Sequence, residues 1–122
     1  MNSVLLSLLL SLVLTLAVEL TLAFLLKVRD KKDLLVIALS NLLTNPIVNY
    51  CYYWAIFIFT KHSVFTYIIL AFLEVAAVLT EYMIYRKLLS YDRIGKLNLS
   101  LILNAASFLT GIALSAALRL LQ

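Results

Sequence analysis

The chain lacks the residues from which most metal centres and hydrolytic active sites are built. It has one cysteine, Cys51, and one histidine, His62. A single cysteine excludes an intramolecular disulfide, and one histidine cannot supply the several nitrogen or sulfur ligands of a zinc site. No G-x-S-x-G or H-E-x-x-H motif is present. We therefore predict no metal and no cofactor, and an enzyme is the least favoured class of function.

Glycine and proline are scarce as well, since Gly95, Gly111 and Pro46 are the only three in 122 residues. Because glycine is the most permissive backbone residue, so low a content argues against large conformational rearrangements. Pro46 lies inside an apolar run, where its ring removes a helical hydrogen bond. It predicts a helix kink or local unwinding that frees the carbonyl groups of Leu42 and Leu43 as ligands.

Charged residues make up only 13% of the chain, whereas 65% is apolar and the mean hydropathy is +1.07. A soluble domain of this size keeps much of its surface in water and could not hide so many apolar side chains. Each of four apolar runs reaches the roughly 20 residues that a helix needs to cross a bilayer. We predict one integral membrane domain over residues 1–122, an all-α four-transmembrane-helix bundle with helices at about 3–26, 34–60, 63–85 and 97–118.

Basic residues predict the orientation of this bundle in the cell (plasma) membrane. They gather in two loops, with few elsewhere: Lys27, Arg29, Lys31 and Lys32; Arg86, Lys87, Arg93 and Lys96. By the positive-inside rule, loops 27–33 and 86–96 are cytoplasmic and both termini lie outside. Topology thus accounts for the +4 net charge, and no nucleic-acid partner is needed. The lipid bilayer is the expected partner, with anionic headgroups near the basic loops.

Carboxylates and carboxamides inside the apolar runs are the strongest functional signal. An ionised side chain at mid-bilayer costs at least about 2.5–3.5 kcal/mol, so such residues usually face a bundle interior and mark a site. At 1.5 Å per residue, these residues lie about 8–18 Å from the charged ends of their spans. Because all four helices contribute at similar depths, we predict one ligand, ion or proton site: Glu19, Asn41, Asn45, Glu74, Glu81 and Asn104.

Small and polar residues also follow one face of each predicted helix. Such stripes often serve only to join helices by close packing, and we assign this helix-packing role to Ser107, Gly111 and Ser115.

The two halves of the chain share a pattern. Glu19 is followed 22 residues later by Asn41-Leu42-Leu43-Thr44, and Glu81 is followed 23 residues later by Asn104-Ala105-Ala106-Ser107. Each pair encloses a basic loop. The hypothesis is that the bundle consists of two parallel helical-hairpin repeats, in which Glu19 corresponds to Glu81 and Asn41 to Asn104.

The whole chain resembles a family of small, uncharacterised four-helix prokaryotic integral membrane proteins. The residues that carry the resemblance are Glu19, Asn41-Leu42-Leu43-Thr44-Asn45-Pro46, Leu73-Glu74 with Glu81 and Tyr85, and Asn104-Ala105-Ala106-Ser107-Phe108 with Gly111. The resemblance implies the architecture only. Relatives carry His where this chain has Asn45, so a histidine-based site is not implied here.

Three functions remain open on the sequence. The first is transport or permeation of a cation or of a proton-coupled small solute, because carboxylate, amide and carbonyl oxygens suit hard cations. The second is a structural or regulatory subunit that binds another membrane protein or a second copy of this chain. The third is an intramembrane enzyme, although Glu74 and Glu81 are two helical turns apart.

Overall fold

A computed structural model describes residues 3–60 and 63–121, so Lys61 and His62 lie outside the described residues. Four helices form the described chain, and no strand occurs in it. This confirms the predicted all-α four-helix bundle. The helices are α1 (Ser3–Leu25), α2 (Lys31–Phe59), α3 (Val64–Leu88) and α4 (Lys96–Leu120).

All four helices are long and apolar enough to cross a membrane. The outward surface of the helices is correspondingly apolar. Phe57 is 81% exposed and Phe72 is 72% exposed, among many other large apolar side chains. Such a surface would be strongly unfavourable in water, whereas the acyl chains of a bilayer solvate it. The molecule is a small multi-pass membrane protein.

Three helices extend beyond the predicted apolar runs at one end or both, whereas α1 ends at Leu25, one residue short of its predicted end. α2 begins at Lys31 rather than near residue 34, α3 ends at Leu88 rather than 85, and α4 ends at Leu120 rather than 118. Hydropathy marks only the hydrocarbon-spanning part, while backbone hydrogen bonding continues into the headgroup region. The first loop is correspondingly short, because the Asp30 carboxylate caps α2 by accepting from the Lys32 backbone N–H at 2.9 Å.

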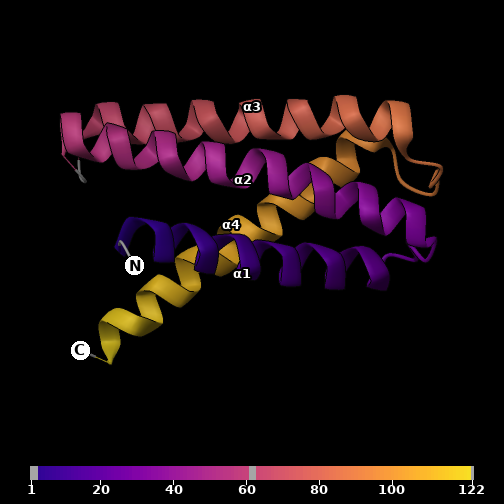
Figure 1. The fold of residues 1–122 in the computed structure, drawn as a ribbon, viewed down its shortest axis with the longest axis horizontal. Coiled ribbons are helices and arrows are strands. Elements are labelled where there is room, and N and C mark those ends of the chain that lie inside the picture. Colours follow the sequence, from indigo (N-terminus) through magenta and orange to yellow (C-terminus); the bar gives the residue numbers. More distant parts are fainter. Residues whose placement is uncertain (1–2, 61–62, 122) are drawn as a thin grey trace.

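The helices form a closed ring of neighbours. α2 packs between α1 and α3, and α4 packs against both α1 and α3. In Figure 1, α4 starts beside α3 and crosses behind the other helices until it emerges beyond α1. Every residue from 112 to 121 is exposed, so the second half of α4 lies outside the bundle.

The two ends of the bundle differ in packing. The loop end, at the right in Figure 1, carries the α1–α2 and α3–α4 loops, and the terminal end carries the start of α1, the end of α2, the start of α3 and the end of α4. The apolar core gathers at the loop end and consists of Ala23, Val28, Val36, Ile37, Tyr85, Leu89, Tyr91, Leu99 and Leu103. The two loops also bind each other, since the Tyr91 hydroxyl donates to the Leu26 carbonyl oxygen at 2.7 Å.

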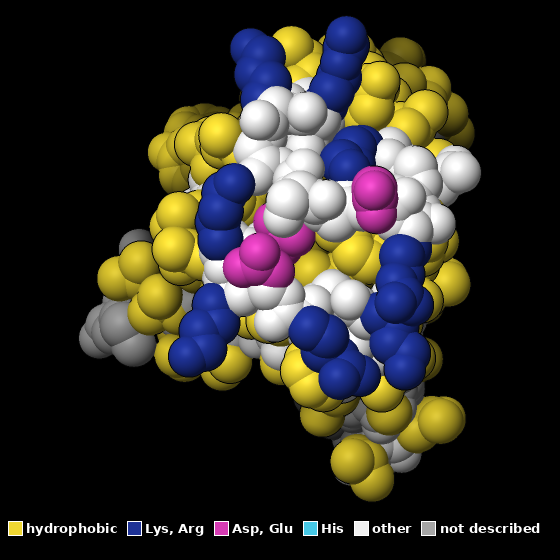
Figure 2. All heavy atoms as spheres, turned by 90° about the vertical axis from the view of Figure 1, so that its right-hand side faces the viewer, with side chains coloured by type: hydrophobic (Ala, Val, Ile, Leu, Met, Phe, Trp, Pro, Cys, Tyr) yellow, Lys and Arg dark blue, Asp and Glu magenta, His cyan; other side chains and the backbone are white. Residues whose placement is uncertain are grey.

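Charge is concentrated at the same end. Figure 2 looks onto the loop end and shows lysine and arginine side chains around its rim, with acidic side chains further in. The gathering of basic groups at one end agrees with the sequence pattern. Which side of the membrane this end faces stays a prediction.

Candidate functional site

Glu19 on α1 and Asn41 on α2 form the first half of a buried polar cluster. Glu19 is 0% exposed and Asn41 is 1% exposed. The Asn41 amide nitrogen donates to Glu19 Oε1 at 3.2 Å and to the Ile37 carbonyl oxygen, one turn back on its own helix, at 3.0 Å. A backbone carbonyl can only accept, so this second bond fixes which end of the amide faces the carboxyl.

Glu81 on α3 forms the second half, and it too is 0% exposed. Asn104 on α4 donates to Glu81 Oε2, and its amide nitrogen also donates to the Ser100 carbonyl oxygen at 2.8 Å. Thr44 on α2 contributes a further contact, from its hydroxyl to Glu81 Oε1 at 3.2 Å. All four helices therefore meet at these two carboxyl groups.

The contacts of the two halves repeat. In each, an asparagine donates to the glutamate of the preceding helix and to the carbonyl oxygen four residues before itself. Three residues after each asparagine, a hydroxyl reaches toward the other half: Thr44 contacts Glu81, and Ser107 lies near Glu19. This pattern agrees with the two-repeat hypothesis at the site. Away from it the halves differ, because α4 diverges from α3 (Figure 1).

The pair of carboxyl groups has no basic counterpart. Amide and hydroxyl groups are the only groups that form hydrogen bonds with Glu19 or Glu81 in the described chain. The two carboxyls lie close enough for their charges to repel each other. Two buried anions without a cation are strongly unfavourable in a low-dielectric interior. The site therefore favours the uptake of positive charge.

Three buried polar atoms near this level have no hydrogen-bond partner in the described part of the chain: Glu19 Oε2, Asn45 Oδ1 and the Tyr85 hydroxyl. Tyr85 is 0% exposed and lies within electrostatic range of both carboxyls. Buried polar groups are nearly always paired, so each unpaired one requires an explanation. Here they mark an incompletely satisfied site.

Two of the six predicted site residues stand apart from the carboxyl pair. The Asn45 amide nitrogen donates to the Thr15 hydroxyl at 3.0 Å, one turn from Asn41 toward the terminal end. Glu74 is half-buried, and no hydrogen bond reaches it among the described residues. Seven residues separate it from Glu81, or about 10.5 Å along the helix axis. The structure thus brings together Glu19, Asn41, Glu81 and Asn104, with Asn45 and Glu74 further along.

Thr44 and Tyr85 belong to the cluster, yet sequence reasoning did not place them in it. The signal for Thr44 was the repeated Asn-x-x-Ser/Thr spacing, which puts a hydroxyl almost one turn beyond each asparagine. Tyr85 lies one turn beyond Glu81 on the same helix face, as i, i+4 residues do. An aromatic residue near the end of a membrane helix usually lies at the membrane–water interface, so the sequence alone does not predict that Tyr85 is buried.

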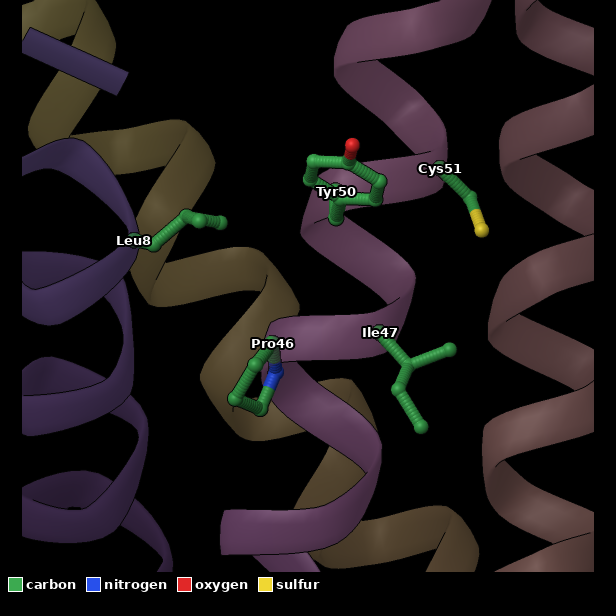
Figure 3. Close-up of a pocket in the computed structure, with 5 residues that line it drawn as sticks. All are labelled: Leu8, Pro46, Ile47, Tyr50 and Cys51. Carbon is green, nitrogen blue, oxygen red and sulfur yellow. The ribbon is translucent and has the colours of Figure 1, made fainter. Parts of the chain in front are cut away.

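The expected unwinding at Pro46 is absent, because α2 is helical from Lys31 to Phe59. Figure 3 shows what lies there instead, an apolar hollow of about 310 Å³ lined by Leu8, Pro46, Ile47, Tyr50 and Cys51. Leu8 projects from α1 toward α2, while Ile47 and Cys51 point toward α3. The α2 helix continues through the position of the lost hydrogen bond, and the expected kink at Pro46 stays a prediction.

The predicted close-packing role of Gly111 and Ser115 is not realised within the chain. A Cβ placed on Gly111 would meet nothing within 4 Å, and Ser115 is exposed. The reason is the crossing angle of α4, which carries these residues away from α1. Ser107 does lie at the helix contact, and its hydroxyl donates to the Asn104 carbonyl oxygen at 3.1 Å.

The described residues contain no group of three or more His, Cys, Asp or Glu side chains that could hold a metal ion. Comparisons with protein-family models, curated proteins and solved structures gave no match to this chain. The function is therefore inferred from the geometry of this chain.

Proposed function

We propose that this protein carries a cation, or a proton-coupled small solute, across the membrane, with Glu19 and Glu81 as its ion-binding carboxyl groups. The observation that carries the proposal is the pair itself: two fully buried carboxyls from different helices, without a basic partner among residues 3–60 and 63–121. Asparagine alone would join these helices at lower cost. Ionisable groups at membrane depth are usually retained for ion pathways or proton relays.

The hydrogen bonds around the pair support an ion-binding role. Asn41, Asn104 and Thr44 hold the two carboxyls in place from three different directions. This arrangement fixes their positions without neutralising their charge. A bound positive ion then relieves both the repulsion between the carboxyls and the cost of burying them.

The residues between the carboxyl pair and the terminal end are more polar than those between the pair and the loop end. On the terminal side lie Thr15, Asn45 and Asn49, which are linked by hydrogen bonds from Asn45 to Thr15 and from Asn49 to the Asn45 carbonyl oxygen. Half-buried Glu74 lies further along α3 on the same side. Toward the loop end, the apolar core around Leu89, Tyr91 and Leu99 separates the carboxyls from the basic rim. These positions favour exchange at the terminal end.

Flux in proteoliposomes tests the proposal. Proton, sodium and potassium flux would be compared for wild type, Glu19→Gln, Glu81→Gln and a control, Asp92→Asn, which changes an exposed acidic group at the loop end. We expect both glutamine variants to lose flux while the control retains it. Flux absent from well-folded wild type, or unchanged in both glutamine variants, would exclude the carboxyl pair as a transport site.

One observation favours a second function, that of a subunit in a larger membrane complex. Among the described residues, the outer half of α4 is exposed throughout positions 112–121, with Ile112 at 52% and Leu118 at 53%. Another helix, from a partner or a second copy, could pack there as well as lipid. Co-purification of a defined second membrane protein, together with an inactive isolated chain, would favour this alternative.

The resemblance to a small four-helix membrane family also stays a proposal.

A further inference from the structure

We infer that the ion held at this site is a proton and that Glu81 Oε1 carries it, in a hydrogen bond to the Thr44 hydroxyl oxygen. The inference rests on the proposed function and names the ion of the same site. We count the hydrogen atoms that the hydrogen bonds around Glu81 require, using only groups of this chain.

Thr44 is the residue that requires the proton. Its hydroxyl oxygen lies 3.0 Å from the Ser40 carbonyl oxygen and 3.2 Å from Glu81 Oε1. A threonine hydroxyl has one hydrogen and two lone pairs, and a backbone carbonyl can only accept. One hydrogen cannot fill both contacts, and we assign it to Ser40, the shorter of the two. The contact with Glu81 is then completed by a hydrogen on Oε1, which Glu81 donates to a lone pair of Thr44.

The amide groups do not remove the need for a hydrogen on Glu81 Oε1. The amide nitrogens of Asn41 and Asn104 each give one hydrogen to a carboxyl and the other to a carbonyl oxygen one turn back. Both amides thus turn donors, not acceptors, toward the carboxyls. Their oxygens do not face the centre as metal ligands would.

Few oxygens around the pair are free of hydrogen bonds, whereas calcium takes six to eight oxygen ligands and magnesium demands octahedral coordination. Of the four carboxyl oxygens, three already take part in hydrogen bonds, and Glu19 Oε2 has no partner in the described chain. The other buried side-chain oxygens without a partner among the described residues are the Asn45 amide oxygen and the Tyr85 hydroxyl. Half-buried Glu74 lies about 10.5 Å further along α3. A proton, by contrast, needs only one oxygen to hold it and one to accept from it.

The ionisable groups around Glu81 are all acidic or neutral. Glu19 faces it from α1, and Glu74 and Tyr85 act on it from α3. The residues that α2 and α4 present to it, Thr44 and Asn104, do not ionise. No positive side chain competes for the carboxyl, so adding one proton to the Glu81 carboxylate both neutralises it and removes its repulsion from Glu19.

Infrared difference spectroscopy in proteoliposomes tests the inference, because a protonated carboxyl has a C=O band that a carboxylate lacks. We expect such a band in wild type at neutral pH. It should disappear in Glu81→Gln, remain in Glu19→Gln and shift in Thr44→Val. The matched control is Thr80→Val, which removes a hydroxyl that is bound to the Ala76 carbonyl oxygen and not to either carboxyl of the pair. It should leave the band unchanged.

Three results would overturn the inference: no carboxylic-acid band, a band that disappears in Glu19→Gln but not in Glu81→Gln, or a band that Thr44→Val does not shift. The Thr44 and Thr80 variants retain both glutamates, so they give an answer even where a glutamine variant fails to fold. Loss of the band on addition of sodium, potassium or magnesium would also overturn it, while carboxyl-dependent cation flux would still stand. Conversely, a band that behaves as expected in a protein without flux would refute the transport proposal alone.

Discussion

Asn41 and Glu19 are joined across the α1–α2 interface, where the asparagine amide nitrogen donates to Glu19 Oε1 at 3.2 Å. Both side chains are essentially inaccessible, at 1% and 0% exposed. The bond therefore ties two membrane helices together and at the same time fixes the position of an ionisable group. Asn104 and Glu81 repeat the relationship on α3 and α4.

The Asn41–Glu19 bond should be measurable by a double-mutant cycle of Asn41→Ala and Glu19→Ala, since each substitution removes one partner of the bond. Interhelical hydrogen bonds in membranes contribute about 0.6 kcal/mol on average and up to about 1.7 kcal/mol. We expect a coupling in this range in the free energy of unfolding, measured in mixed detergent micelles. Pairing Asn41→Ala with Glu74→Gln serves as the control, since no hydrogen bond reaches Glu74 among the described residues. Equal couplings in both cycles would contradict the assignment.

Much of this site could be predicted from the sequence. Glu19, Asn41, Glu81 and Asn104 stand out because polar residues within spans have few explanations, and their similar distances from the basic loops place them at similar depths. Glu74 was grouped with them for the same reason, but depth and helix face do not determine which side chains touch. Contact depends on helix crossing, and here α4 reaches Glu81 and then turns away from the bundle (Figure 1).

The loop end is held by a second polar contact, between Ser90 and Asp33. Asp33 is 2% exposed, and it accepts from the Ser90 backbone N–H at 3.0 Å and from the Ser90 hydroxyl at 2.9 Å. Ser90→Ala should lower the free energy of unfolding by about 1 kcal/mol, and Asp33→Ala by about 1.5–3 kcal/mol, because hydrogen bonds to charged groups are stronger. The exposed Asp92→Ala is the control.

Hydrogen exchange offers a local readout of the same contact. The segment 89–95 should exchange faster in Asp33→Ala, whereas the helices around Glu19 and Glu81 should remain protected. Uniformly faster exchange across all four helices would show that Asp33 supports the whole fold instead of the loop.

Orientation can be tested with single cysteines in a Cys51→Ser background. Asp92→Cys places the thiol in the α3–α4 loop, and Val64→Cys places it at the start of α3, at the opposite end; both positions are exposed. Because the basic rim surrounds the loop end (Figure 2), we expect a membrane-impermeant maleimide to label Val64→Cys in intact cells and Asp92→Cys only after lysis. The reverse pattern would contradict the predicted topology.

The outer half of α4 distinguishes a self-contained transporter from a subunit. In a self-contained protein, Gly111→Leu should preserve flux and oligomeric state, since a Cβ at this position meets nothing within 4 Å. Stability should be unchanged or higher by up to about 1 kcal/mol, because glycine is a poor helix residue. Ala113→Leu, also exposed, is the matched control. Loss of flux or of an associated protein in Gly111→Leu alone would show that a partner helix packs on this face.

The positions of the hydrogen atoms around Glu81 cannot be predicted from the sequence. The sequence predicts a carboxyl near asparagines, but not that Thr44 lies within reach of both Ser40 and Glu81. The burial of Tyr85 likewise follows from its packing in the apolar core, to which residues far apart in the chain contribute from all four helices. Such features depend on distances of a few ångströms, which helix periodicity does not determine.

The central claim is that Glu19 and Glu81 form one site rather than two. Ion flux in proteoliposomes, measured for Glu19→Gln, Glu81→Gln and the double variant, tests it most directly. Residues that act as a unit are strongly non-additive. Each single variant should lower flux by at least about tenfold, and the double variant should be no slower than the slower single variant. Effects that multiply in the double variant would contradict a single shared site.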